Sequence, residues 1–319
     1  MEHEKRLLIL AGGGGHTGFA YALSQRLENR ATMSFLIPEG DNLSFKRLSN
    51  FGKVDTLVKP RGAKTPTNEF LYKLCQAFSS SRKKVTKDFD VVVSAGSNFC
   101  IPPAFAALSK KIKLVNIEGA VRFTRASLTA RILQPFSAIT ALPWPEQKKL
   151  LKGTVVGPLL HKQEIEPYNG GYILVTGGTL GHKALFDVVN ESNLKNVVLQ
   201  TGEVDPEPYM KRHSEWKIIR YSSKFAELLA GAELVVTHFG STALETAVYN
   251  KPAVMVVNPE WTRTVGKTDA ELFAKKVGVT ILPRLSLDCL LESIEEAKKQ
   301  KRPVLKDGAE ALADIILKL

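Results

Sequence analysis

The segment RLLILAGGGGHTG, residues 6–18, decides the fold of this chain. Its apolar start, residues 6–11, is typical of a buried strand, and the glycines after it lead into a helix predicted at residues 17–27. Glycine lets the backbone approach a ligand closely, and the N-terminus of a helix attracts an anion. A strand, a glycine turn and a helix in this order indicate a parallel α/β unit with a ligand beyond the strand end.

The alternation of apolar runs with helical patterns continues along the whole chain. Strands are expected at residues 6–11, 33–38, 54–58, 90–94, 113–117 and 138–141, and again at residues 172–175, 196–200, 217–220, 233–237, 253–257 and 279–282. The polar stretch 161–171 contains Pro167, Gly170 and Gly171 and is typical of a linker. We predict an α/β protein with two Rossmann-like domains, residues 1–160 and 161–319, and an interdomain cleft. The terminal helix, residues 307–319, belongs to the second domain or packs back on the first.

Positive charge is concentrated in the first half. Residues 1–161 contain 24 Lys and Arg against 11 Asp and Glu, whereas residues 162–319 contain 20 against 21. Such an excess indicates an anionic partner, unless it is a solvated surface. Basic residues flank or lie in a predicted amphipathic helix with Phe70, Leu71, Leu74 and Phe78; they are Lys59, Arg61, Lys64, Lys73, Arg82, Lys83, Lys84 and Lys87. This patch can dock on an anionic membrane, or its apolar stripe can join the core.

Several features indicate a protein of the cytoplasm whose membrane contact is peripheral. The three cysteines form no close pair and no zinc spacing, which fits a reducing compartment. The opening MEHEKRLLIL predicts a strand rather than a signal peptide or anchor, and no stretch reaches the ~18 apolar residues of a spanning helix. Asp88-Phe89-Asp90 matches a D-x-D metal signature, but Asp90 begins a predicted strand, so we expect no metal there.

The first glycine turn allows two chemistries. Gly13, Gly15 and Gly18 satisfy the dinucleotide pattern G-x-G-x-x-G, with Glu39 near the ribose-binding position. An NAD(P)-dependent oxidoreductase must therefore be considered, although the motif alone is weak evidence. His16 is unusual for a cofactor loop and could accept a proton from an attacking hydroxyl, because its unperturbed pKa lies near neutrality. It could equally cap or pack the helix.

The second half holds two further turns of this kind. TGGTLG, residues 176–181, follows a predicted strand and is either a second ligand loop or a structural tight turn. THFGSTALE, residues 237–245, places a Gly-Ser-Thr turn before a helix, where backbone N–H groups suit a diphosphate. Glu245 could accept hydrogen bonds from ribose hydroxyls or form a capping box with Ser241 or Thr242.

Taken together and in order, these blocks resemble a known enzyme. The first half is similar to the membrane-recruiting, acceptor-side subunit of the UDP-N-acetylglucosamine transferase that adds the second sugar to the dolichol-diphosphate N-glycan precursor. The blocks are GGGHT (13–17), DVVVSAGSNFCIP (90–102), VNIE (115–118), SLT (127–129) and WPE (144–146). The second half resembles the donor-side subunit through VTGGT (175–179) and residues 237–258. Both halves are more distantly similar to the bacterial enzyme that adds N-acetylglucosamine to the peptidoglycan lipid precursor.

The resemblance implies a GT-B fold and an inverting reaction that needs no metal in the active site and no other cofactor. His16 is then the base. The residues implied to face the acceptor are Gly14, Gly15, Thr17, Ser97, Asn98 and Glu118. The residues implied to hold the UDP-sugar are Gly178, Thr179, Tyr221, Ser222, His238, Gly240, Ser241, Thr242, Glu245, Thr268 and Asp269.

The chain also departs from the family pattern. Ser97-Asn98 replaces a Pro-Gly pair, and Lys267-Thr268-Asp269 replaces an Asn-His-Gln run at a place where sugar identity can be read. The donor sugar therefore stays open. The acceptor-side subunit usually carries an N-terminal membrane anchor, which we do not expect here. With both halves in one chain, we also expect no need for a partner subunit.

We predict a hexosyltransferase that moves a sugar, expected to be N-acetylglucosamine, from UDP to a polyprenyl- or dolichyl-diphosphate-linked sugar at the cytoplasmic membrane face. It would serve protein N-glycosylation or a surface polysaccharide. The alternatives are a UDP-sugar 2-epimerase of the same architecture and the NAD(P)-dependent oxidoreductase. A nucleic-acid partner is not expected, since only the charge favours it. Lipid length, the first acceptor sugar and the oligomeric state are left open.

Overall fold

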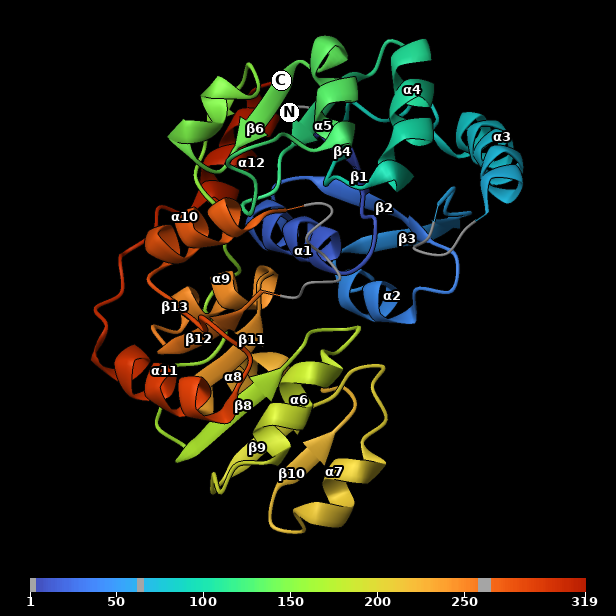
Figure 1. Cartoon of the computed structure of the whole chain (residues 1–319). Helices are drawn as coiled ribbons and strands as arrows, with labels where there is room; N and C mark the ends of the chain where they lie inside the picture. Colours follow the sequence, from blue (N-terminus) through green and yellow to red (C-terminus); the bar gives the residue numbers. More distant parts are fainter. Residues whose placement is uncertain (1–3, 62–65, 258–264) are drawn as a thin grey trace. The chain divides into compact units, whose positions relative to one another are not determined.

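The computed structural model describes residues 4–61, 66–257 and 265–319, and it divides into two compact units (Figure 1). The first unit consists of Met1–His161 together with Lys306–Leu319, and the second of Lys162–Leu305. Lys64 of the predicted basic patch and Asn258 of the donor-side resemblance lie outside the described residues. Within the described ranges, no helix is both long and apolar enough to span a bilayer.

The first unit is built on a parallel sheet of seven strands in the order β3-β2-β1-β4-β5-β6-β7. The strands are β1 (Arg6–Leu10), β2 (Thr32–Pro38), β3 (Gly52–Leu57), β4 (Val91–Ser94), β5 (Lys113–Ile117), β6 (Ile139–Leu142) and β7 (Thr154–Val155). The central strand β1 pairs with β2 and β4, with Leu8 opposite Ser34 and Val92. Apolar residues on both faces of β1 explain its central place, because a parallel sheet is covered on both sides.

Helices cover both faces of this sheet. They are α1 (Gly15–Leu27), α2 (Asn42–Leu48), α3 (Thr67–Lys84), α4 (Ile101–Ser109), α5 (Leu128–Leu133) and α12 (Gly308–Lys318), with 3-10 turns η1 (Asn98–Cys100), η2 (Gln134–Phe136) and η3 (Pro145–Lys149). Side chains alternate along a strand, so Leu7 and Ile9 pack with α1 and α12, whereas Leu8 and Leu10 pack with α3, α4 and α5.

The last helix, α12, belongs to the first unit rather than to the unit that precedes it in sequence. It packs against α1 and contributes Leu312 and Ile316 to the core (Figure 1). Asp307 caps the N-terminus of α12 and forms a 2.6 Å ion pair with the buried Arg26 of α1. The chain therefore returns to its first unit at the end of the sequence.

The second unit has a parallel sheet of six strands in the order β10-β9-β8-β11-β12-β13. Its strands are β8 (Tyr172–Thr176), β9 (Val197–Gln200), β10 (Lys217–Ile219), β11 (Ala232–His238), β12 (Ala253–Val256) and β13 (Thr280–Ile281). Its helices are α6 (Lys183–Asn190), α7 (Glu207–Arg212), α8 (Phe225–Gly231), α9 (Ser241–Val248), α10 (Lys267–Val277) and α11 (Leu287–Lys299). One face packs Val175, Leu199 and Val236 against α6, α7 and α11.

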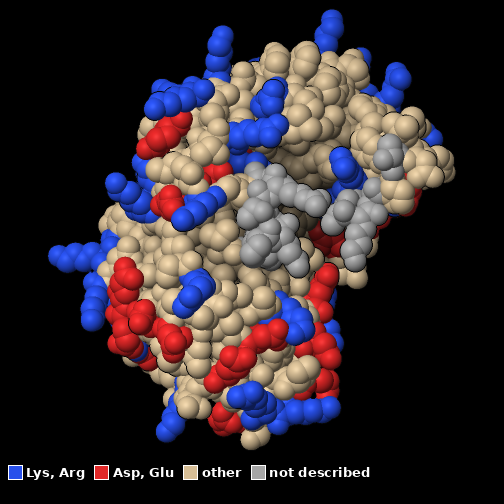
Figure 2. Space-filling view, in the orientation of Figure 1, with Lys and Arg blue, Asp and Glu red and all other residues tan. Residues whose placement is uncertain are grey.

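The prediction of two parallel α/β domains is confirmed. Every strand expected from an apolar run overlaps an observed strand, with ends that differ by at most two residues. The structure adds β7, a strand of two residues that is too short to give an alternating pattern. Figure 2 shows Lys and Arg spread over the first unit. On the second unit, Asp and Glu are interspersed with Lys and Arg.

Candidate functional site

The glycine turn of the first unit joins β1 to α1. Gly13 and Gly14 have φ angles of 88° and 56°, in the left-handed region that glycine adopts without strain. Gly14 is the N-cap residue of α1, and no side chain of the described residues caps this helix. A Cβ at Gly14 would meet nothing within 4 Å, so space is open in front of the helix N-terminus. This turn can therefore present backbone N–H groups to an anionic ligand.

His16 lies in the first turn of α1 and is oriented by the end of β4. Its Nδ1 is 2.9 Å from the carbonyl oxygen of Ala95. Because a carbonyl only accepts, Nδ1 carries the proton in the neutral ring and Nε2 is left as the basic nitrogen. Burial lowers the pKa of His16, and the charges of Lys59 and Arg122 lower it further, against the opposing effect of the Ala95 hydrogen bond. The ring is thus neutral at pH 7, as a base requires.

The turn after β4 packs against the glycine turn. Ser97 has φ 74° and ψ 152°, an unusual conformation for a residue with a side chain. A Cβ at Gly12 would overlap the Cβ of Ser97, and one at Gly96 would lie 2.7 Å from His16 Nδ1. Asn98 follows and donates to the Arg61 carbonyl at 3.4 Å. The structure thus brings together His16 and the predicted acceptor residues at these two turns.

Two predicted acceptor residues use their side chains within the fold. Thr17 is 3% exposed, and its hydroxyl lies 2.6 Å from that of Ser44. Glu118 is 1% exposed and accepts from the backbone N–H groups of Gly119 at 2.6 Å and Ser127 at 2.7 Å. Burial raises the pKa of Glu118, although these hydrogen bonds oppose the effect. Thr17 therefore supports the start of α1, and Glu118 holds the loop after β5.

In the second unit the turn after β8 packs against the end of β9. The backbone N–H of Gly178 donates to Thr176 Oγ1 at 3.1 Å. Gly181 and Gly202 have φ angles of 77° and 63°, and a Cβ on either would overlap the backbone of the facing turn. Thr179 itself is exposed at the surface of this turn. Glycine is thus required at positions 181 and 202 for the close approach of the two backbones.

Gln200, which the sequence analysis did not single out, connects this turn to Ser222, one of the residues implied to hold the UDP-sugar. It is 6% exposed at the end of β9. Its Oε1 accepts from the Ser222 N–H at 3.2 Å, and its Nε2 donates to Thr176 Oγ1 at 3.2 Å. Tyr221 donates its hydroxyl to the Thr179 carbonyl at 3.3 Å. The sequence contained a signal for Gln200, because it is a polar residue at the end of the apolar run of β9. Ligands of such parallel sheets bind beyond the carboxyl ends of the strands.

His238 ends β11 between two glycines. A Cβ at Gly178 would lie 2.9 Å from His238 Cε1, and one at Gly240 would lie 2.7 Å from His238 Nε2. The imidazole is 8% exposed. Burial, helped by the charge of His182, lowers the pKa of His238 to about 4. A neutral ring therefore separates the turns after β8 and β11.

Helix α9 begins at Ser241 with Gly240 as its N-cap residue, and within the described chain no side chain caps it. Because Gly240 is the N-cap residue, Ser241 and Thr242 lie inside the helix and not at the capping position considered for a box with Glu245. Thr242 and Glu245 are 6% and 9% exposed. An uncapped N-terminus with nearby hydroxyls suits a diphosphate.

Helix α10 packs against the start of α9, with the rings of Phe239 and Phe273 at 5.3 Å. At its N-terminus the carboxylate of Asp269 accepts from the Gly266 N–H at 2.9 Å and is 3% exposed. Thr268 is exposed beside it. Asp269 thus uses one carboxylate oxygen to cap its own helix.

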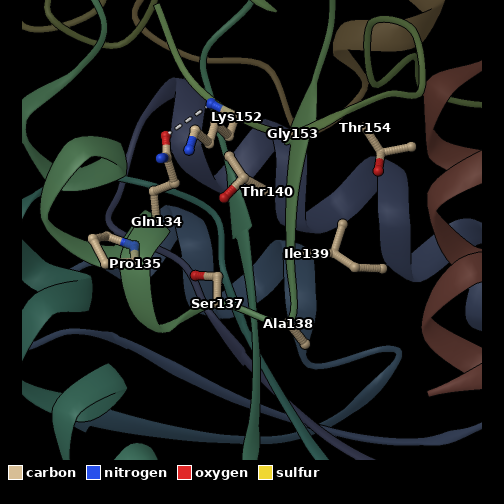
Figure 3. A pocket seen from close by; sticks show the side chains of 9 residues that line it. All are labelled: Gln134, Pro135, Ser137, Ala138, Ile139, Thr140, Lys152, Gly153 and Thr154. Atoms are coloured by element: carbon tan, nitrogen blue, oxygen red, sulfur yellow. Dashed lines mark hydrogen bonds between the residues drawn. The ribbon is translucent and has the colours of Figure 1, made fainter.

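Two other features lie apart from these turns. Asp90 of the D-x-D sequence exchanges 2.8 Å hydrogen bonds with the backbone of Arg6, and the described residues contain no cluster of three metal-ligating side chains. A hollow of about 430 Å³ lies beside the amino ends of β6 and β7, where the Lys152 N–H donates to Gln134 Oε1 at 3.1 Å (Figure 3). None of the predicted site residues lines it.

Each half of the chain matches a different family model. Residues 7–159 match the family described as oligosaccharide biosynthesis protein Alg14 like, and residues 172–315 match the glycosyltransferase family 28 C-terminal domain. The chain is a UDP-sugar glycosyltransferase. It is 25% identical to the UDP-N-acetylglucosamine--N-acetylmuramyl-(pentapeptide) pyrophosphoryl-undecaprenol N-acetylglucosamine transferase of Rippkaea orientalis, over 98% of this chain and 97% of that protein.

Solved structures support the GT-B architecture. MurG of Acinetobacter baumannii has a TM-score of 0.64 at 18% identity and covers 99% of this chain and all of its own. A putative UDP-N-acetylglucosamine 2-epimerase of Listeria monocytogenes has a TM-score of 0.70 at 14% identity, over 99% and 95% of the two chains. At these identities the likeness shows the fold alone. The two family models together with the sequence relative, rather than the fold, therefore support glycosyl transfer to a lipid-linked acceptor.

Proposed function

We propose that this glycosyltransferase moves N-acetylglucosamine from UDP-N-acetylglucosamine to a polyprenyl- or dolichyl-diphosphate-linked sugar, with inversion at the anomeric carbon. The observation that carries the proposal is His16, a neutral histidine whose Nδ1 is held by Ala95 beside the open N-terminus of α1. The Alg14-like match of the same half supports an acceptor-binding role. A single chain would supply both the acceptor and the donor half.

The chemistry follows from the protonation state of His16. An acceptor hydroxyl attacks the anomeric carbon of the donor sugar and gives its proton to Nε2 of His16. The bond between that carbon and the UDP oxygen breaks, and UDP leaves with the electron pair. We assign the charge of the leaving diphosphate to the N-terminus of α9, where Gly240, Ser241 and Thr242 lie. Gly178 and Glu245 would complete the UDP site, and no metal is needed for these steps.

The test is a transfer assay. Purified full-length protein is incubated with UDP-N-acetylglucosamine and a short polyprenyl-diphosphate-N-acetylglucosamine, and the lipid is analysed by mass spectrometry. A product heavier by one N-acetylhexosamine is expected, with undiminished yield in EDTA. If UDP raises the melting temperature but no product forms, the choice of sugar or lipid is wrong. Appearance of UDP-N-acetylmannosamine from UDP-N-acetylglucosamine alone would favour the 2-epimerase that the similar folds allow.

His16→Ala tests the base directly. Positioned general bases contribute about 100- to 10,000-fold to rate, so kcat is expected to fall within that range. UDP binding, measured by calorimetry, should remain, because His16 lies in the first unit and the proposed UDP residues in the second. Turnover equal to wild type would remove His16 from the mechanism.

We further propose that the side of the first unit formed by α3, α4 and α5 docks on an anionic membrane at the cytoplasmic face. Its exposed apolar residues are Leu71, Tyr72, Leu128 and Phe136, with exposed fractions of 57%, 70%, 67% and 52%. Exposed basic residues on or near the same helices are Arg82, Lys83, Lys87 and Arg131. Of the predicted apolar stripe, Leu71 is exposed, whereas Phe70, Leu74 and Phe78 are half-buried.

Vesicle flotation tests this surface. Tyr72→Asp should weaken binding to vesicles that contain phosphatidylserine, because a charge replaces apolar contact area. Leu291→Asp, on α11 of the second unit with 40% exposure, is the matched control. Equal binding of both variants would place membrane contact elsewhere.

A further inference from the structure

A hollow of the first unit lies at the opposite edge of the sheet from His16. It has about 430 Å³ and is lined by residues beside the amino ends of β6 and β7, whereas His16 follows the carboxyl end of β1. The strands of this sheet all run parallel, so their amino ends meet at one edge and their carboxyl ends at the other. Ligand sites in proteins commonly measure about 300–1,000 Å³. The hollow is therefore large enough for a small ligand and is separate from the turn that carries the proposed base.

The wall of the hollow contains a buried hydroxyl that the fold does not use. Thr140 lines the hollow from β6 and is 4% exposed, and its Oγ1 has no hydrogen-bond partner among the described residues. Its register neighbour on β5, Asn116, donates its amide N–H to the Ala130 carbonyl at 3.1 Å instead. A buried hydroxyl without a partner is unfavourable, so a polar group that bonds to it from the hollow would be bound favourably. Thr140 thus indicates a polar ligand.

Gln134 and Lys152 bring further donors to the same place. The backbone N–H of Lys152 donates to Gln134 Oε1 at 3.1 Å. Because this bond uses the oxygen of the amide, the two N–H donors of Gln134 stay available to a ligand. Gly153 lies against β6, since a Cβ there would be 2.4 Å from the Thr140 carbonyl oxygen. Figure 3 shows the side chains of Gln134, Lys152 and Thr140 at the same end of the hollow.

The surroundings of the hollow are basic. None of the described residues that line it is acidic. Residues 131–154, the segment that contains all of the lining residues, have four exposed cations against a single acidic residue, Glu146. The cations are Arg131, Lys148, Lys149 and Lys152. An ammonium group, amide N–H groups and a hydroxyl can all donate, so the hollow suits an anion that has several acceptor oxygens.

We propose that the hollow binds a phosphate monoester, whose oxygens accept from Lys152 Nζ, Gln134 Nε2 and Thr140 Oγ1. A phosphate monoester offers three terminal oxygens and between one and two negative charges, which suit these three donor groups and the basic surroundings. The apolar residues of the same lining, such as Ile139, would contact the carbon part of the ligand. The monoester can be a free molecule or the headgroup of a phospholipid such as phosphatidic acid. The inference goes beyond the proposed function, since it concerns a second site that holds its ligand without reacting.

Titration calorimetry of the full chain with glycerol 3-phosphate tests the site. Thr140→Val keeps the volume of the side chain and removes the hydroxyl, and Lys152→Met removes the charge. Each variant should bind glycerol 3-phosphate about tenfold more weakly than wild type, as expected for the loss of a hydrogen bond to a charged group. Thr56→Val and Lys53→Met are the matched controls and should bind as wild type does, because both residues lie on β3, at the far side of the sheet. The melting temperature of Thr140→Val should be no lower than that of wild type, because its Oγ1 bonds to no described residue.

Vesicles distinguish the two sources of the ligand. If phosphatidic acid is the ligand, vesicles that contain it should compete with glycerol 3-phosphate, and Thr140→Val should weaken binding to both. If the ligand is a free phosphate monoester, the vesicles should leave the affinity for glycerol 3-phosphate unchanged. Both results support the site. Absence of glycerol 3-phosphate binding at millimolar concentration, or equal affinity in Thr140→Val, Lys152→Met and the two controls, overturns the inference. None of these measurements needs a sugar donor or acceptor, so their result does not depend on the proposed function.

Discussion

The two units use the same strand positions differently. β1 and β8 hold equivalent places in their sheets, as do β4 and β11. In the first unit no side chain of the described residues caps the helix after β1, and Ser97 caps the short turn after β4. In the second unit His182 caps the helix after β8, and the helix after β11 has no side-chain cap from the described part of the chain. The helix that lacks a side-chain cap thus follows the central strand β1 in the first unit, whereas in the second unit it follows β11, the neighbour of the equivalent strand β8.

The surroundings of the two turns differ as well. At the first turn the Lys59 ammonium donates to the Gly12 carbonyl and His16 is half-buried, whereas the second turn is supported by the neutral groups of Thr176, Gln200 and His238. Glycine content alone does not separate these cases, because one turn needs glycine for an open N-terminus and the other for contact between backbones. The comparison teaches that the role of a glycine turn depends on the residues that the sheet brings beside it.

Gly96→Ala is expected to have the largest effect on the first turn. The new Cβ would lie 2.7 Å from His16 Nδ1, and φ at this position is 96°. A catalytic group displaced by about 1 Å can lose on the order of 100-fold in rate, so kcat should fall by that factor. UDP affinity should not change. Gly14→Ala, which meets open space at φ 56°, is the control for backbone strain. Equal loss in both variants would mean that strain, not displacement of His16, is responsible.

Acidification should destabilise the protein through His238, which lies between the turns after β8 and β11. The folded-state pKa is about 4, below the ordinary 6.5, so the unfolded chain takes up this proton first. Stability is therefore lost as the pH falls from about 6.5 towards 4, by about 2 kcal/mol at pH 4.5. The loss should be smaller in His238→Asn, as measured by urea unfolding at a series of pH values. Parallel curves for the two proteins would rule out this contribution.

Gln200→Leu should weaken binding of the UDP-sugar donor and leave binding of the acceptor unchanged. It removes the hydrogen bonds to Ser222 and Thr176, which are worth about 1 kcal/mol each or less to a flexible turn. KM for the UDP-sugar should rise about tenfold while KM for the acceptor stays constant. A similar rise in both constants would show a general loss of structure instead.

Ser97→Gly should have the smallest effect and a favourable one. A residue with a Cβ at φ 74° and ψ 152° is strained, and glycine relieves this at the expense of a more flexible unfolded chain. A net gain of about 1 kcal/mol in the free energy of unfolding is expected, measured by urea denaturation. A loss of stability would mean that the contact of Ser97 with Phe99 outweighs the strain.

Much of the fold could be predicted from local patterns. The apolar runs at β1, β4 and β8 follow from burial on both faces, and glycine turns after them mark the strand ends at which ligands bind. The place of His16 in such a turn was visible for the same reason. Thr17 and Glu118 show the limit, because a motif does not reveal that Ser44 or Ser127 will occupy their polar atoms.

The sequence by itself determined two parallel α/β units, their strand ends and the glycine turns, because these depend on near neighbours along the chain. The tertiary structure decided that Ala95 orients His16, that Gln200 joins two turns of the second unit, and that α12 returns to the first. It also decided that Lys59 and Gly12 meet at one turn, where the Lys59 ammonium donates to the Gly12 carbonyl. They are far apart in sequence, and they come together because the strands that precede them end at the same edge of one sheet.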